Sequence, residues 1–94
     1  MKSPTTYRLD TVQAVTITGT SAATANAVGA NTHHVRIVST TACHYVTGKT
    51  PTATTSHSYL PADVVEYVDI TPGEKVAFIQ HAAGGTAYVT EVTK

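Results

Sequence analysis

Alternation of apolar and polar side chains predicts β-strands along most of this chain. The clearest stretch runs from residue 60 to residue 79, and we interpret it as strand, turn, strand. In its first half, alternate positions separate two faces, with Val64, Val68 and Ile70 on one and Val65, Tyr67 and Asp69 on the other. In its second half, residues 76–79 are apolar at every position, which predicts a central strand buried on both faces.

The four residues between these strands predict a type II turn. Pro72 and Gly73 occupy the two central positions, where glycine supplies the positive φ of that turn. Two-residue hairpins favour type I′ or II′ turns, and an L-proline cannot adopt the positive φ at their first central position. We therefore expect this turn to carry the chain from one sheet to another rather than to close a flat hairpin.

Further strands follow from the same pattern, at residues 12–18, 34–40, 42–47 and 86–92. Val15 and Ile17 are expected to point inward from the first of these, and Val35 and Ile37 share a face of the second. Residues 20–32 are rich in Ala, Ser, Thr, Asn and Gly, so we predict a loop with an embedded edge strand. Residues 76–80 and 86–92, joined by a loop at 82–85, are predicted to form an antiparallel hairpin.

Residues 49–59 consist almost wholly of Thr, Ser, Ala and Pro and predict a long polar connection. A Greek key or jelly roll requires long connections that cross between sheets. Six clear strands and two less regular ones thus predict an all-β fold, a small antiparallel β-sandwich or jelly-roll-like domain of six to eight short strands. No segment predicts a helix. We divide the chain into an extended N-terminal arm at residues 1–9, which contains Pro4, and a single β-sandwich domain at residues 10–94.

Composition narrows the range of partners. Charged residues make up 13% of the 94 residues and the formal net charge is zero, whereas an average soluble domain has about 25% charged residues. Because net charge limits self-association, this neutral surface indicates a protein that works in an assembly, as a homo-oligomer. The 6 Lys and Arg residues are scattered, so nucleic acid is not an expected partner. No apolar run has the length of a membrane span or the form of a signal peptide, and we expect no membrane association.

The five histidines are the conspicuous candidates for chemistry: His33, His34, His44, His57 and His81. A zinc site needs three or four converging ligands, and none of the compact spacings is present. His33 and His34 are adjacent and would point to opposite faces of a strand. His44 and His81 belong to separate strands and could meet across a sheet. We interpret the histidines as hydrogen-bonded strand and loop residues, so no metal or other cofactor is predicted.

No other group of residues predicts catalysis. Cys43 beside His44 and Ser56 beside His57 are neighbours whose side chains diverge in a strand, and Cys43 is interpreted as a buried thiol. Gly84-Gly85 lacks the lysine and the helix of a phosphate loop. Four carboxylates near the central bend are interpreted as solvated strand ends or as part of an interface: Asp63, Glu66, Asp69 and Glu74. We therefore predict that the protein is not an enzyme and has no catalytic residues, and a small hydrolase is the least favoured alternative.

Several turn and strand motifs lie between residues 35 and 92: Val35-Arg36-Ile37-Val38, Cys43-His44-Tyr45, Gly48, Pro51-Thr52-Ala53-Thr54, Leu60-Pro61-Ala62, Glu66-Tyr67 and residues 72–79. Together they resemble those of small virion proteins encoded among the structural genes of tailed bacteriophages. This resemblance implies a capsid decoration or cement protein that sits on the head lattice, commonly as a homotrimer, and stabilises the shell. It also implies that the N-terminal arm engages the capsid.

The resulting expectation is a virion protein, assembled in the host cytoplasm, whose partners are the major capsid protein or other virion proteins. A protein that stabilises a shell in this way needs rigid strands and hydroxyl-rich or apolar faces that lose little solvation energy on contact. Two alternatives remain. One is another phage virion component, of the neck, tail or fibre base. The other is a β-sandwich module that binds a glycan or a cell-surface ligand.

Overall fold

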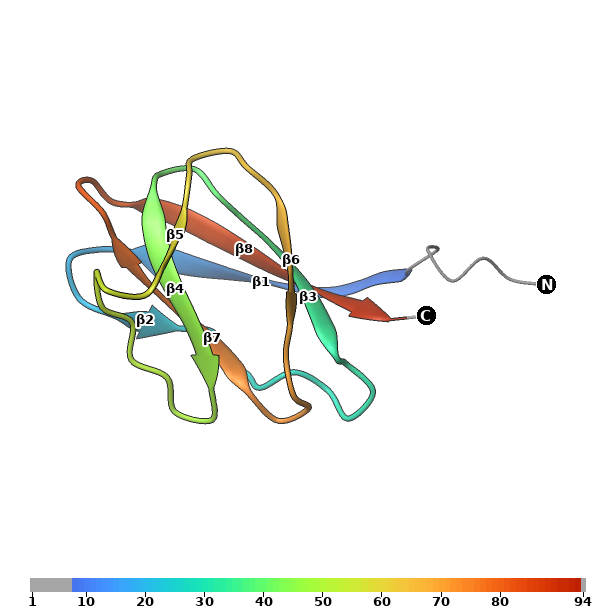
Figure 1. Ribbon diagram of the computed structural model, residues 1–94. Coiled ribbons are helices and arrows are strands. Elements are labelled where there is room, and N and C mark those ends of the chain that lie inside the picture. The colour runs from blue at the N-terminus through green and yellow to red at the C-terminus, as the bar shows by residue number, and fades with distance from the viewer. Residues whose placement is uncertain (1–7, 94) are drawn as a thin grey trace.

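The computed structural model describes residues 8–93, which form eight β-strands (Figure 1). They are β1 (Arg8–Ile17), β2 (Ala22–Ala23), β3 (His34–Ser39), β4 (Cys43–Gly48), β5 (Ser58–Leu60), β6 (Glu66–Asp69), β7 (Lys75–Gln80) and β8 (Gly85–Thr93). Residues 8–93 contain no helix, and therefore no helix that could cross a membrane. Of the predicted N-terminal arm, residues 1–7 lie outside the described range, and Arg8 and Leu9 begin β1.

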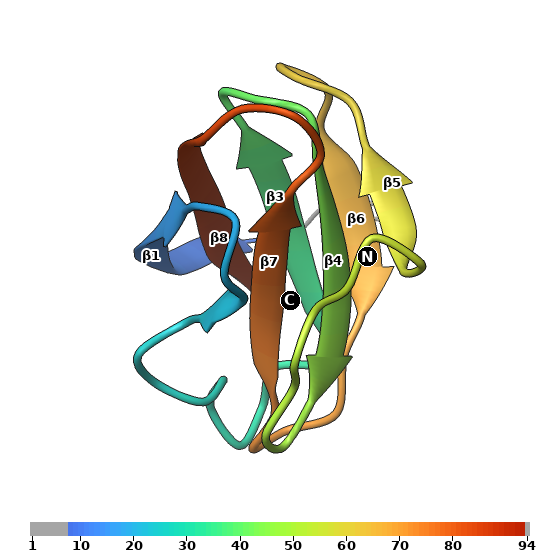
Figure 2. The same ribbon diagram turned by 90° about the vertical axis from the view of Figure 1, so that its left-hand side faces the viewer.

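The strands form two antiparallel sheets of four that pack face to face, so the predicted fold class is confirmed (Figures 1 and 2). Sheet A has the order β1-β8-β3-β6 and sheet B the order β2-β7-β4-β5. The pairs β1·β8, β2·β7, β3·β6 and β4·β5 nest inside one another, as if one long hairpin had been rolled into a sandwich. This nesting is the topology of a jelly roll.

Alternation within the strands builds the core between the sheets. Val15 and Ile17 of β1 are buried, as predicted, and so are Val35 and Ile37, which share one face of β3; they pack against Phe78 and other apolar side chains of sheet B. Fully burying one such side chain contributes about 1.5–3 kcal/mol. The two sheets are therefore held together mainly by these inward-facing positions.

The turn at residues 71–74 has the predicted form and role. Gly73 has φ 91°, and the amide of Glu74 donates a 3.0 Å hydrogen bond to the carbonyl of Thr71. The side chain of Glu74 accepts a second bond, of 3.1 Å, from the Thr71 amide. The turn carries the chain from β6 in sheet A to β7 in sheet B, and β7 lies in the interior of its sheet, with residues 76–78 buried.

Two predicted connections are wrong. Residues 76–80 and 86–92 do not form a hairpin, because β7 belongs to sheet B and β8 is inserted between β1 and β3 in sheet A. Residues 81–84 therefore cross between the sheets. Conversely, residues 49–57 do not cross, since they join β4 to β5, which pair within sheet B. A polar composition indicates a loop but does not indicate which strands it joins.

The strand predicted from residue 64 is shorter than the alternation implies. It begins at Glu66, and Val64 and Val65 are 44% and 40% exposed. Asp63 adopts a left-handed conformation, with φ 62°, and donates its amide to the carbonyl of Ser39 at 2.8 Å. Because of this left-handed conformation, β6 begins later in the chain than predicted. It forms one edge of sheet A. The loop predicted at residues 20–32 does contain an edge strand, β2.

The loop at residues 49–57 covers the outer face of sheet B. Ala53 is 2% exposed, and its amide donates a 2.8 Å hydrogen bond to Oγ of Ser21, next to β2. Ala77 lies between the inward-facing Val76 and Phe78 of β7 and therefore points outward, yet it is fully buried. Figure 2 shows the loop running over the outer side of β4. Sheet B is thus covered on both faces by this chain.

A substitution at Gly84 tests how tightly the chain is packed where it crosses from β7 to β8. A Cβ at this position would lie 2.7 Å from the backbone oxygen of Ile17, which cannot move away as a side chain could. We expect Gly84→Ala to lower the free energy of unfolding by about 1–3 kcal/mol, the usual range for overpacking. Gly19→Ala is the matched control, because its Cβ would approach no atom closer than 3.6 Å. Urea unfolding measures both, and equal stability of the two variants would contradict the tight crossing.

Candidate functional site

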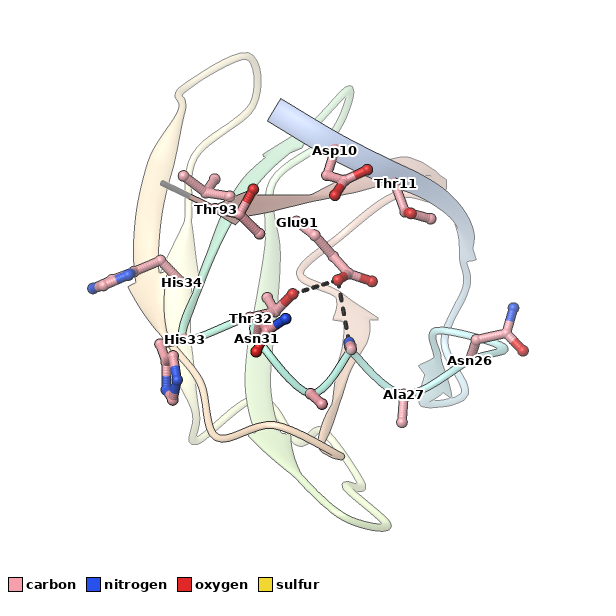
Figure 3. A pocket seen from close by; sticks show the side chains of 13 residues that line it. Asp10, Thr11, Asn26, Ala27, Asn31, Thr32, His33, His34, Glu91 and Thr93 are labelled. Carbon is pink, nitrogen blue, oxygen red and sulfur yellow. Dashed lines mark hydrogen bonds between the residues drawn. The ribbon is translucent and has the colours of Figure 1, made fainter. Parts of the chain in front are cut away.

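A groove of about 970 Å³ opens at one end of the sandwich (Figure 3). Asp10 and Thr11 of β1 and Glu91 of β8 line one side of it. The other side is formed by residues of the segment between β2 and β3, which ends at His34. The groove therefore brings together parts of the chain that are far apart in the sequence.

Glu91 holds the segment that forms the far side of the groove. Its Oε1 accepts a 2.5 Å hydrogen bond from the hydroxyl of Thr32 and a 3.2 Å bond from the amide of Gly29 (Figure 3). Thr32 is 2% exposed, so one end of this link is buried. Glu91 lies on the inward side of β8, opposite Val35 of β3. A carboxylate at a core-facing position thus fixes a loop that has few apolar side chains of its own.

The groove is lined by groups that form hydrogen bonds. Its lining combines the carboxylates of Asp10 and Glu91 with threonine hydroxyls, the amides of Asn26 and Asn31, and two imidazoles, and among the described residues it includes no Lys or Arg. Such a surface fits a polar, uncharged or cationic ligand. No cluster of three or more His, Cys, Asp or Glu side chains within residues 8–93 could hold a metal ion.

His44 and His81 meet on the outer side of sheet B, as the sequence suggested. Nε2 of His44 lies 3.0 Å from Nδ1 of His81, and Nδ1 of His44 lies 3.0 Å from the carbonyl oxygen of His57. Because a carbonyl can only accept, Nδ1 of His44 carries a proton, and in the neutral pair His81 donates to Nε2 of His44. The ring of Tyr59 packs beside both imidazoles, with centroids 5.5 and 5.2 Å away. His44 is 6% exposed and anchors the end of the covering loop.

The remaining histidines do not join this pair. Nδ1 of His57 accepts a hydrogen bond from the amide of Thr54 at 2.9 Å, which closes a turn within the loop. Nε2 of His34 lies 3.2 Å from a carboxylate oxygen of Asp69, whose side chain is 93% exposed, so solvent screens this contact. His33 and His34 both line the groove. His34 thus connects the groove to the outer face of sheet A, where Asp69 lies.

The four carboxylates around the central bend have separate environments. Glu74 bonds within its turn, Asp69 pairs with His34, and Asp63 is an exposed residue with a left-handed backbone. Glu66 instead points between the sheets, where it meets Tyr45. Cys43 is fully buried in the core, and burial raises the pKa of its thiol above the ordinary value. Its side chain and that of His44 occupy opposite faces of β4, as expected for neighbours in a strand.

The hydroxyl of Tyr45 on β4 donates a 2.6 Å hydrogen bond to Oε1 of Glu66 on β6. The bond joins the two sheets, since β4 belongs to sheet B and β6 to sheet A. Burial, the hydrogen bond to Glu66 and the negative charge of that carboxylate raise the pKa of Tyr45 to about 12. The sequence contained no signal for this contact, because the two residues belong to different sheets.

The outer face of sheet A is the largest feature that the sequence did not identify. Its members follow from the strand register, which places partners on the same face: Leu9, Val12, Ala14, Thr16, His34, Arg36, Val38, Tyr67, Asp69, Thr86, Tyr88, Thr90 and Val92. Arg36 and Asp69 are its charged members, and Thr90 and Val92 are buried. Four of its large side chains are between 42% and 60% exposed, namely Leu9, Val12, Tyr67 and Tyr88. Within residues 8–93 no loop covers this surface, which we call the bare face, in the way that residues 49–57 cover sheet B.

Tyr45→Phe tests the link between the sheets. The substitution leaves the Glu66 carboxylate without its donor, and we expect a loss of about 1–2 kcal/mol in the free energy of unfolding at neutral pH. The folded pKa of about 12 lies above the ordinary value of 10, so the contribution of Tyr45 is complete below pH 10 and lost as the pH rises through 12. Urea unfolding at several alkaline pH values measures this. Tyr88→Phe, on the bare face, is the control, and an equal effect of both variants would contradict the assignment.

No family model, curated protein or solved structure matches this chain. The features of residues 8–93 that a function could use are the groove, the histidine pair and the bare face.

Proposed function

We propose that this chain is a non-catalytic structural protein of a tailed-phage virion, and that it acts as a capsid decoration protein. The observation that carries the proposal is the bare face of sheet A. Contiguous exposed apolar surface is uncommon on proteins that act alone and marks sites of protein–protein contact. The same kind of surface on sheet B is covered by the protein's own loop.

The chemistry of the bare face suits a permanent contact. Tyrosine side chains are enriched in interfaces and at their energetic centres, and Tyr67 and Tyr88 are 60% and 42% exposed there. Arg36 and Asp69 are the charged side chains of this face, so most of its members would lose no charge hydration on contact. A twisted four-stranded sheet also holds these side chains rigidly, which lowers the entropy lost on binding.

The fold and the resemblance to phage virion proteins support the same proposal. Jelly rolls occur in viral capsid proteins and in lectins, although a shared fold alone does not establish a shared function. In a decoration protein the bare face would contact the major capsid protein or a second copy in a homotrimer. Many copies on one lattice would then bind by avidity even where each contact is weak. A neck, tail or fibre-base component would use the same face against a different virion protein.

Val12→Lys tests the bare face. Val12 is 58% exposed, so the substitution should leave the fold intact, whereas burying a lysine at a contact should weaken binding to heads by at least about tenfold. Ala23→Lys is the matched control, because Ala23 is an exposed residue of β2 at the edge of sheet B. Co-sedimentation of each variant with phage heads that lack the protein measures binding. Native mass over a concentration series measures self-association.

Two outcomes would contradict the proposal. One is a wild-type protein that neither self-associates nor co-sediments with heads. The other is binding by Val12→Lys that equals binding by the wild type and by Ala23→Lys, which would exclude the bare face from the contact.

A second candidate function, binding of a glycan, is favoured by the groove. Its carboxylates, amides and hydroxyls are groups that bond sugar hydroxyls, although no Tyr or Phe of residues 8–93 lines it as a platform on which a sugar could stack. If it binds a saccharide, the amide resonances of Gly29 and Thr32 should shift on titration, and Asn31→Ala should weaken the affinity. Thr54→Ala, outside the groove, is the control. Unchanged resonances with a panel of saccharides at millimolar concentration would exclude this function.

A further inference from the structure

His44 and His81 place two ring nitrogens 3.0 Å apart beside the covering loop. Two metal–nitrogen bonds of about 2.0–2.1 Å that meet at about 90° hold their nitrogens about 2.9 Å apart, and at the tetrahedral angle about 3.4 Å. The observed separation lies within this range. We propose that Nε2 of His44 and Nδ1 of His81 bind one late first-row divalent ion, of the class Cu²⁺, Ni²⁺ or Zn²⁺.

The surroundings of His44 are those of a metal-binding imidazole. A histidine ligand usually donates its other ring N–H to a carbonyl or carboxylate, which fixes its tautomer and its orientation. Nδ1–H of His44 donates to the carbonyl of His57 at 3.0 Å, so Nε2 is the nitrogen with the free electron pair. Burial at 6% exposure and the adjacent ring of Tyr59 restrict the imidazole to this orientation.

His81 supplies the adjustable ligand. Its backbone is held by a 3.1 Å hydrogen bond from its amide to the carbonyl of Ala42, while its side chain is exposed. The ring can therefore turn so that its electron pair points at the ion instead of at His44. In the neutral pair the proton on Nδ1 of His81 then moves to Nε2, so that coordination changes a tautomer and releases no net proton.

Two imidazoles leave the other coordination positions to water or to a group on a partner. Within residues 8–93 no third His, Cys, Asp or Glu completes the set. Such a site differs from a structural zinc centre, which is closed by four protein ligands. It is an open site of imidazole ligands, a ligand type that suits copper, nickel and zinc and does not suit calcium or magnesium.

Zinc titration of the full-length protein, followed by nitrogen-15 NMR of the histidine rings at about pH 7.5, tests the proposal, because imidazoles are then largely neutral. With one equivalent of Zn²⁺ we expect the resonances of Nε2 of His44 and Nδ1 of His81 to shift. The proton on Nδ1 of His44 should be retained. His81→Ala should weaken zinc affinity, measured by calorimetry, by at least about tenfold, and His33→Ala, at the groove rim, should leave it unchanged.

The nitrogen-15 NMR spectra of the wild-type histidine rings test the proposed metal site even if a variant does not fold. The proposal is overturned if zinc up to about 1 mM shifts neither His44 nor His81. It is equally overturned if the bound ion shifts only His33 and His34, or if His81→Ala binds zinc as tightly as the wild type.

Discussion

The pairing of β8 with both β1 and β3 is the constraint on which the rest of the structure depends. This last strand lies inside sheet A, between the first strand and the third, so sheet A cannot form until both ends of the domain have come together. Most contacts are accordingly distant in sequence, which predicts slow folding for a chain of this size. The same insertion forces residues 81–84 to cross between the sheets and requires glycine at Gly84, where the backbone of Ile17 approaches closely. It also places Glu91 where it can hold the segment at Gly29 and Thr32.

The two outer faces of the sandwich differ in how they are covered. On sheet B the loop at residues 49–57 lies over Ala77 and is held by Ser21 at one point and His44 at another. On sheet A the side chains of Leu9, Val12, Tyr67 and Tyr88 on the bare face remain exposed. Within residues 8–93 the chain thus covers one outer face with its own loop, whereas several large apolar side chains of the other stay exposed. This asymmetry is the observation that supports the proposed attachment to a partner through sheet A.

The polar groups of the interior have mainly structural roles. Tyr45 and Glu66 connect the sheets, Glu91 connects β8 to a loop, and His44 connects β4 to the covering loop. Within residues 8–93 each buried side-chain nitrogen or oxygen has a hydrogen-bond partner, so these links offset the cost of removing polar atoms from water. The contact between Nε2 of His44 and Nδ1 of His81, 3.0 Å apart, differs because it links two side chains and holds no loop in place. The metal ion that we propose would take the place of this contact, with the same two nitrogens as its ligands.

The sequence by itself determined the local elements. Alternation placed Val15 and Ile17 inward and put Val35 and Ile37 on one face. The positions of Pro72 and Gly73 determined both the type II turn and its passage between sheets. It also suggested that His44 and His81 could meet. Only the tertiary structure decided which strands are neighbours, because a period of two separates two faces but does not say what covers each. For that reason the predicted hairpin at residues 76–92 was wrong. The groove and the Tyr45–Glu66 hydrogen bond had no signal in the sequence. The bare face could be identified only once the strand order was known.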